Sequence, residues 1–246
     1  MSDKDLQFTL LQARNAGDPV RLEERAAFAE RLGVDVSCIH PVDILTEHLH
    51  LDLLENRDAL LVGGAGEHSV VEPAPGVQAM IEFLGETSER GFPTFASCFG
   101  FQSIVLALGG DVIHDEDAAE VGSFFVDRLD AAIDDPVFGG LPERFVAQQG
   151  HKDRASRLPE AAVCLAKSEL APFQAIRIGT HPVYATQFHP ELTRDSNRAR
   201  FKRYLSDYQH VFGRNKAQEM LDEFMPSPHA SGLLGTFADA LRSGAL

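Results

Sequence analysis

Short apolar runs alternate with amphipathic stretches along the first 110 residues of the chain. Continuous apolar runs are typical of buried strands, whereas apolar positions three or four residues apart are typical of helices. The pattern predicts strands at residues 6–13, 34–41, 59–62 and 92–97, and helices at residues 21–33, 76–91 and 101–110. Strands that alternate with helices through short polar connections predict an α/β fold, in which helices cover both faces of an open, mostly parallel, twisted sheet.

The pattern changes in the second half of the chain. Residues 161–168 and 173–190 are typical of consecutive strands, and residues 179–182 are typical of a hairpin turn. Consecutive strands joined by tight turns pair antiparallel. We therefore expect a small antiparallel extension of the parallel sheet.

The last fifty residues return to helical periodicity. A helix is predicted at residues 196–213, followed by two short helices at 215–224 and 231–246. We expect residues 1–213 to form one domain and residues 214–246 to be a helical tail that packs on the same domain.

Composition and charge narrow the class of protein. Hydrophobic residues make up 44% and charged residues 24% of the 246 residues, which is ordinary for a soluble globular protein. The formal net charge of −15 repels phosphate backbones, so we expect no binding to nucleic acid. No apolar run approaches the length of a membrane span, and no basic segment followed by an apolar one starts the chain, so we expect neither membrane association nor secretion.

The three cysteines indicate a reducing compartment. Their number is odd and their spacing is unpaired, which argues against a disulfide framework and favours a cytoplasmic location. Cys38 and Cys164 lie inside apolar stretches without a nearby base, so we expect both to be core thiols. The ten histidines show no paired ligand spacing, so no metal and no cofactor are predicted.

Cys98 lies where a predicted strand runs directly into a predicted helix. A tight turn of this kind exposes its residue at the carboxyl end of the sheet, where ligands bind in open α/β folds. The N-terminus of the following helix stabilises a thiolate, and Gly100 permits the crowding of such an elbow. A buried core cysteine explains the same stretch, so both interpretations stay open at this point.

Two other stretches could complete a site around a thiolate. His189 ends an apolar strand, and the carboxylate of Glu191 could fix its tautomer. The loop at residues 63–66 could offer backbone N–H groups to an oxyanion. A histidine that merely ends a strand, a solvated glutamate and a structural glycine turn explain these stretches equally well.

Taken together and in order, these stretches resemble the class I glutamine amidotransferases. Residues 96–102 (Ala-Ser-Cys-Phe-Gly-Phe-Gln) are similar to the Gly-x-Cys-x-Gly-x-Gln elbow of that family, and residues 187–191 reproduce its Gln-Phe-His-Pro-Glu motif. Residues 120–122 are similar to the Glu-x-Gly strand that lines the glutamine site of the family. Residues 149–153 are similar to the His-x-Asp segment of GMP synthase glutaminase domains. The resemblance covers about residues 5–205.

The resemblance implies a flavodoxin-like fold and a Cys98–His189–Glu191 triad. Cys98 would attack the side-chain amide of glutamine and form a γ-glutamyl thioester. His189 would act as the base and then protonate the leaving ammonia, while Glu191 orients it. The backbone N–H groups of Phe99 and Gly64 would hold the oxyanion.

The resemblance also implies a binding site for the amino-acid end of glutamine. The residues that would form it are Gln102, Glu120, Val121, Gly122 and His151. The chain departs from the family pattern at Ala96, at Phe101 in place of the usual histidine, and at Ala65 in place of a proline. None of these departures removes a triad member, but Phe101 suggests a different surface or pocket wall beside the nucleophile.

Three functions remain compatible with the sequence. The first is a glutaminase that passes ammonia to a separate synthase subunit, since no P-loop is present for acceptor chemistry. The second is a stand-alone γ-glutamyl peptidase or hydrolase that uses the same thioester chemistry. The third is a catalytically silent binding module on the same fold. The sequence favours the first function and contains no indication of the oligomeric state.

Overall fold

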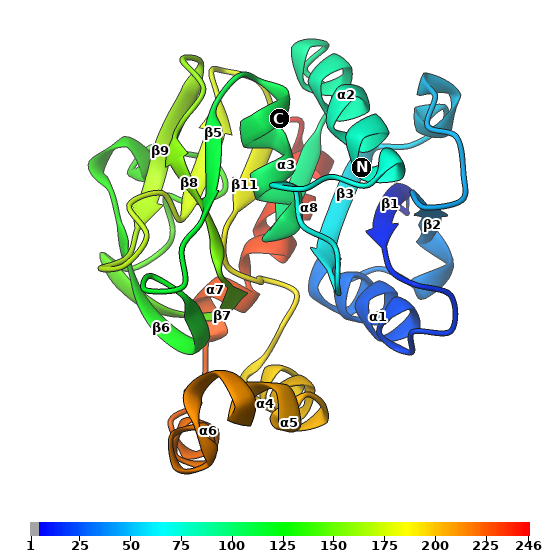
Figure 1. The fold of residues 1–246 in the computed structure, drawn as a ribbon. Coiled ribbons are helices and arrows are strands. Elements are labelled where there is room, and N and C mark those ends of the chain that lie inside the picture. The colour runs from blue at the N-terminus through cyan, green and yellow to red at the C-terminus, as the bar shows by residue number, and fades with distance from the viewer. Residues whose placement is uncertain (1–4) are drawn as a thin grey trace.

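A nine-stranded sheet forms the centre of the computed structural model, which describes residues 5–246 (Figure 1). Its strand order is β2-β1-β3-β4-β11-β10-β9-β6-β7, and β5 and β8 form a second, two-stranded sheet. The strands are β1 Phe8–Ala13, β2 Ile39–Asp43, β3 Ala59–Ala65, β4 Thr94–Ser97, β5 Asp111–His114, β6 Glu120–Arg128, β7 Arg144–His151, β8 Asp153–Arg157, β9 Ala162–Lys167, β10 Ala175–Ile178 and β11 Val183–Thr186.

Helices cover both faces of the parallel half of the sheet, as the sequence pattern predicts. The α-helices are α1 Val20–Leu32, α2 Pro75–Glu89, α3 Phe99–Ala107, α4 Arg194–Arg203, α5 Leu205–Phe212, α6 Arg214–Asp222, α7 Pro228–Ser231 and α8 Leu233–Ser243. One buried cluster joins the sheet to α1 and α8, and a second joins the other face to α2 and α3. The α/β fold class is therefore confirmed.

Strands β2, β1, β3, β4 and β11 run parallel, and their carboxyl ends meet at one edge of the sheet. Strands β10, β9, β6 and β7 extend this sheet in antiparallel fashion. The extension is larger than expected, because the sequence pattern identified β9, β10 and β11 but not the full lengths of β6 and β7. The long pair β6–β7 alternates only in part, so its periodicity is weak.

Two local expectations are wrong. The segment before β2 is a 3₁₀ turn at Val36–Cys38, because the Asp35 side chain accepts a hydrogen bond from the Ser37 N–H at 2.8 Å. Cys38 is buried in this turn rather than in a strand. Cys164 does lie on β9, but it is only partly buried, and burial raises the pKa of its thiol.

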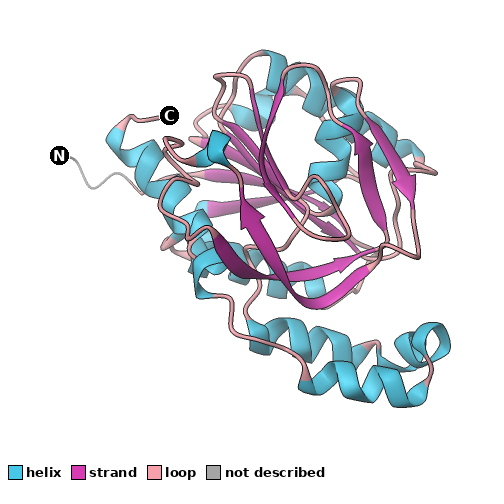
Figure 2. Ribbon diagram, turned by 90° about the vertical axis from the view of Figure 1, so that its left-hand side faces the viewer, coloured by secondary structure: helices cyan, strands magenta, loops and turns pink. Residues whose placement is uncertain are grey.

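The helix predicted at residues 196–213 is two helices. The first of them, α4, begins two residues earlier than predicted, because Thr193 and Ser196 form a reciprocal capping box. The helical segment is interrupted at Tyr204, and α5 starts at the next residue. Gly213 then separates α5 from α6 with a positive φ of 84°. These three helices lie together beyond one end of the sheet (Figures 1 and 2).

The three helices contact the rest of the chain through a small apolar cluster. Phe201, Leu221 and Phe224 pack there against Val121 of β6. The last helix, α8, returns to the main core and packs on α1. Residue 213, where we expect the domain to end and its helical tail to begin, lies between α5 and α6, and this division stays a prediction. In the described part of the chain, no helix is long and apolar enough to cross a membrane.

Candidate active site

Cys98 occupies a strained elbow between β4 and α3. Its backbone has φ 50° and ψ −100°, which L-residues rarely adopt, and its N–H donates to the Thr186 carbonyl of β11 at 2.7 Å. A Cβ atom on Gly100 would lie 2.8 Å from the Cβ atom of Val62, so only glycine fits below the turn. The neighbouring elements therefore hold Cys98 in this conformation, a feature of nucleophile elbows.

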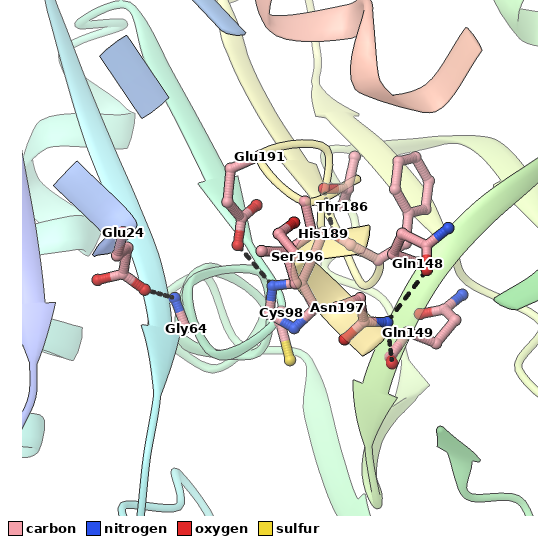
Figure 3. Close-up of polar contacts among 12 residues, drawn as sticks. Glu24, Gly64, Cys98, Gln148, Gln149, Thr186, His189, Glu191, Ser196 and Asn197 are labelled. Carbon is pink, nitrogen blue, oxygen red and sulfur yellow. Dashed lines mark hydrogen bonds and ion pairs between the residues drawn. The ribbon is translucent and has the colours of Figure 1, made fainter. Parts of the chain in front are cut away.

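His189 and Glu191 follow β11 at the same edge of the sheet. The His189 Nδ1 atom lies 2.6 Å from the Glu191 Oε1 atom, and both side chains are almost fully buried (Figure 3). The main-chain N–H of His189 donates to the Gln148 carbonyl of β7 at 2.9 Å. The imidazole is thus oriented both by its backbone and by a carboxylate.

The charges of this group stabilise a protonated imidazole. Burial lowers the pKa of His189, but the nearby Glu191 and Cys98 outweigh burial and raise it to about 10. Burial raises the pKa of Glu191, but the His189 charge outweighs that effect and lowers it. Among the described residues, the second carboxylate oxygen of Glu191 has no hydrogen-bond partner. The histidine is therefore well placed to take a proton from the thiol.

The two expected oxyanion donors lie in different environments. Phe99 is the first residue of α3, so its N–H has no acceptor within the helix, and it borders a pocket that contains Cys98. The N–H of Gly64 instead donates to Glu24 Oε1 at 3.2 Å. Figure 3 shows this contact on the opposite side of His189 from Gln148 and Asn197. In this conformation Gly64 does not offer its N–H to the thiol.

Glu24 is the centre of a buried cluster that no sequence motif indicated. Arg14 Nη2 donates to its Oε1 atom at 3.0 Å, and Gln12 Nε2 donates to its Oε2 atom at 2.8 Å. Burial lowers the pKa of Arg14, but Glu24 and Asp18 outweigh that effect and raise it. Both carboxylate oxygens of Glu24 are thus satisfied, and the cluster ties α1 to the ends of β1 and β3.

Two pockets meet at Cys98. The first, which we name the small pocket, has a volume of about 250 Å³ and contains Phe99, Gln102, Gly150 and His151. The second, the large pocket, has a volume of about 570 Å³ and contains His189 but neither Phe99 nor Gln102. Ala65, Gly66, Glu67 and Gly150 border both pockets.

Gln102 and His151, which we expect to bind the amino-acid end of glutamine, both border the small pocket. Gln102 Nε2 donates to the Asp153 carbonyl at 2.8 Å and lies 3.4 Å from Gln187 Oε1. Gln187 Nε2 in turn lies 3.8 Å from the Cys98 sulfur. Gln187 belongs to the 187–191 motif, but no role was predicted for it from the sequence, and the structure places it between Gln102 and the thiol.

The predicted segment at residues 120–122 does not form one wall of a pocket. The Glu120 carboxylate is buried behind the small pocket, where it lies 3.1 Å from His151 Nε2. Val121 borders the large pocket, whereas Gly122 borders neither pocket at Cys98. Alternate residues of a strand point to opposite faces, so the side chains of Glu120 and Val121 point apart, and Gly122 has no side chain.

Phe101 is a second correction. It replaces the histidine usual in the family, and we expected it to change the pocket wall beside Cys98. Its ring is instead fully buried in the core between α3 and its neighbours, and it borders neither pocket at Cys98. Adjacent side chains on an α-helix point about 100° apart, which is how Gln102 borders the small pocket while Phe101 does not.

Helix α4, the turn at Tyr204 and helix α5 supply further residues of the large pocket that the sequence did not predict. Asn197, Arg200, Phe201, Tyr204 and Tyr208 all border it. Asn197 Nδ2 lies 3.2 Å from Gln148 Oε1 and 3.3 Å from the Gln149 carbonyl, which fixes α4 against β7 (Figure 3). In the part of the chain that the structure describes, no group of three or more His, Cys, Asp or Glu residues could hold a metal ion.

The chain is similar to known proteins over most of its length. The glutamine-hydrolyzing GMP synthase of Thermosipho africanus is 30% identical over 194 residues, which are 79% of this chain and 32% of that protein, so the chain spans about a third of its length. One of the subunits of the glutamine-hydrolyzing GMP synthase of Thermoplasma acidophilum is 28% identical over 165 residues, 65% of this chain and 74% of that protein.

The fold has a similar counterpart among solved structures. The crystal structure of a glutamine amidotransferase from Thermotoga maritima superposes with a TM-score of 0.70 at 18% identity, and covers 97% of this chain and 98% of that one. The family model described as "Glutamine amidotransferase class-I" matches residues 26–204. The chain therefore belongs to the class I glutamine amidotransferase family.

Proposed function

We propose that the protein hydrolyses the side-chain amide of glutamine to glutamate and ammonia through a γ-glutamyl thioester on Cys98. One observation carries this proposal. The strained Cys98 elbow lies beside a buried histidine whose Nδ1 atom is 2.6 Å from the Glu191 carboxylate. A thiol, a base and a group that orients the base are the parts that nucleophilic acyl transfer needs.

The proposed reaction has two halves. His189 takes the proton of the Cys98 thiol, and the sulfur attacks the amide carbon. As the C–N bond breaks, His189 gives the proton to the nitrogen, and ammonia leaves. A water molecule then attacks the thioester, His189 takes its proton, and glutamate is released with the thiol restored.

The oxyanion of each half would be held by backbone donors. The Phe99 N–H at the start of α3 is one, and the positive end of the helix dipole reinforces it. A second donor from residues 64–66 requires that segment to turn, since the Gly64 N–H is bonded to Glu24 here. Ala65 and Gly66 border both pockets and are the nearest alternatives.

The small pocket suits the amino-acid end of glutamine. It contains the Gln102 amide, and charges of both signs at Lys152 and Glu67 face the zwitterion of an amino acid. Because one relative is itself one of the subunits of a GMP synthase, we propose that the ammonia acceptor is a separate synthase subunit. A cytoplasmic location remains a prediction from the cysteines.

A second candidate is a γ-glutamyl hydrolase with the same chemistry. The large pocket favours it, because about 570 Å³ beside His189 far exceeds the roughly 30 Å³ that a molecule the size of water or ammonia occupies. The intact arrangement of Cys98, His189 and Glu191 counts against a silent binding module.

The test is ammonia release from glutamine by the wild type, Cys98→Ala and Cys164→Ser. We expect turnover by the wild type and by Cys164→Ser, and a loss of about 10³-fold or more in Cys98→Ala. Activity that persists in Cys98→Ala would refute the nucleophile. An inactive wild type, tested alone and with a synthase subunit, would favour the silent module.

A further inference from the structure

We propose that the large pocket selects γ-glutamyl amides whose leaving amine carries a carboxylate, and that Arg200 is the residue that recognises it. This inference rests on the proposed function, since it assigns a substrate class to the same thioester chemistry. It concerns the side of Cys98 that faces α4 and α5.

The position of His189 identifies the side on which the amine leaves. The small pocket contains Gln102 and Phe99, so the glutamyl group lies there. His189, which protonates the leaving nitrogen, borders the large pocket together with Cys98. The two pockets thus lie on the acyl side and on the amine side of the scissile bond.

The amine side has the walls of a binding site. Helices α4 and α5 cover it, and the rings of Phe201 and Tyr208 stack with centroids 4.2 Å apart. Tyr204 adds a third ring at the border. Concave sites lined by aromatic rings and a few polar groups are typical of small-molecule recognition.

Helix α4 places a cationic side chain, Arg200, at the border of the large pocket. Arg200 is partly buried, and no ion pair or hydrogen bond joins it to any described residue. Two neighbouring arginines of α4 have partners: Arg203 is 2.6 Å from Glu23, and Arg198 donates to the Leu221 carbonyl at 2.7 Å. Arg200 is thus an available donor that faces the pocket.

Arg14 and Asp18 are already paired, and Glu67 has an uncharged partner. Arg14 is held by Glu24, and Asp18 lies 3.8 Å from Arg14 and accepts from the Val20 N–H. Glu67 accepts a hydrogen bond from Asn15 at 3.0 Å. A guanidinium without a partner binds a planar carboxylate through two parallel hydrogen bonds, which is why we assign a carboxylate to the amine.

The reaction balances without any further reactant. The Cys98 sulfur forms a bond to the γ-carbon, the C–N bond breaks, and the proton from His189 goes to the amine nitrogen. Water hydrolyses the thioester. One amide and one water give glutamate and one free amino acid, as expected for a γ-glutamyl peptide.

The experiment compares matched amides by their ratio of kcat/KM. The substrates are γ-glutamylglycine and γ-glutamyl-β-alanine, each against its carboxamide counterpart, which differs only in the charge of the amine. A ratio is used because the Arg200 charge also lowers the pKa of Glu191, and any effect on the triad cancels between substrates. Variants are Arg200→Met, Arg200→Lys and Arg200→Glu, with Arg194→Met as the control.

We expect the wild type to prefer at least one carboxylate substrate about 10-fold or more, the range of a charged hydrogen bond. Arg200→Met should lose that preference, Arg200→Lys should keep part of it, and Arg200→Glu should reverse it. Arg194 is exposed, pairs with Asp195 and does not border the pocket, so Arg194→Met should keep the preference.

Two results separate the failure of this inference from that of the proposed function. A wild type that hydrolyses glutamine through Cys98 but shows no carboxylate preference overturns the inference alone, and so does a preference that Arg200→Met retains. A wild type that hydrolyses neither glutamine nor any γ-glutamyl amide overturns the proposed function as well.

Discussion

Two buried carboxylates lie on either side of Gly64, and they differ in how completely they are satisfied. Glu24 accepts hydrogen bonds at both oxygens from Arg14, Gln12 and the Gly64 backbone. Glu191 contacts His189 through one oxygen, and its other oxygen has no partner among the described residues. Each carboxylate is paired with one buried cationic side chain. Arg14 and His189 both border the large pocket, but it is His189, the partner of Glu191, that interacts with Cys98.

This difference in hydrogen bonding indicates that Glu24 is a structural contact, whereas Glu191 is a candidate active-site residue. A buried charge whose hydrogen bonds are complete holds segments together, and removing it leaves its partner charge unpaired. An incompletely bonded carboxylate beside a titratable histidine in a pocket is typical of an active site. We therefore expect substitutions at Glu24 to change stability most, and substitutions at Glu191 to change turnover most.

Of the substitutions at the two carboxylates, Glu191→Gln should have the larger effect on turnover. The amide keeps the size of the side chain but cannot stabilise the charged imidazole, so ammonia release should fall about 10²- to 10⁴-fold. Steady-state kinetics on glutamine would measure it, with circular dichroism to show that the variant is folded. Unchanged turnover would remove Glu191 from the proposed triad.

The His189–Glu191 pair and the Arg14–Glu24 pair should also differ in how the stability that they contribute depends on pH. The pKa of His189 is raised from its ordinary value of 6.5 to about 10, so the stability gained from its charge is complete below pH 6.5 and is lost as the pH rises to 10. A shift of this size corresponds to up to about 5 kcal/mol. The pKa of Arg14 is raised from its ordinary value of 12.5, so Arg14 keeps its charge throughout this window.

Urea unfolding at a series of pH values from 6.5 to 10 would check this expectation. With rising pH, the free energy of unfolding of the wild type should fall more steeply than that of His189→Gln, because the two proteins differ in no other titrating group. Parallel curves would mean that His189 does not carry the charge in the folded protein.

Glu24→Gln should lower stability by about 3–5 kcal/mol, because it leaves the buried Arg14 with only the more distant Asp18. Thermal unfolding would measure the loss. At a temperature where the variant is folded, its turnover should fall much less than that of Glu191→Gln. A variant as stable as the wild type would contradict the role of Glu24 as a structural contact.

The smallest expected effects come from a matched pair of neighbouring glycines on β3. A Cβ at Gly63 would lie 2.6 Å from the Glu24 carboxyl carbon, whereas one at Gly64 would lie 3.0 Å from His189 Cε1. Gly63→Ala should therefore lower stability by about 1–3 kcal/mol. Gly64→Ala should displace the imidazole by a few tenths of an ångström and lower turnover about 10-fold, with little loss of stability. Equal effects of both variants on turnover would show that the Glu24 contact and the His189 imidazole do not act independently.

The parallel half of the fold could be predicted from local patterns, and the proposed triad is implied by two compact motifs that resemble a known family. Buried parallel strands are continuous apolar runs, and the residues at 96–102 and 187–191 form compact motifs. The break at Tyr204 was not predicted, because helical periodicity continues through it without a proline or glycine. The pair β6–β7 was missed because its alternation is incomplete.

The rest of the site depends on contacts between distant segments. Glu24 lies 40 residues before Gly64, and their hydrogen bond has no sequence signature. Arg200 is one of several arginines on α4, and only the packing of that helix shows which of them faces the pocket. The burial of Phe101 likewise follows from how α3 packs, which a single sequence does not reveal.

The central claim is that Cys98 is the nucleophile, and covalent labelling tests it most directly. The wild type would be incubated with an electrophilic glutamine analogue, with and without excess glutamine, and then analysed by intact mass and peptide mapping. We predict one label per chain, on Cys98, with protection by glutamine and none on Cys38 or Cys164. A label on either of those cysteines that accompanies the loss of activity, with Cys98 unmodified, would contradict the claim.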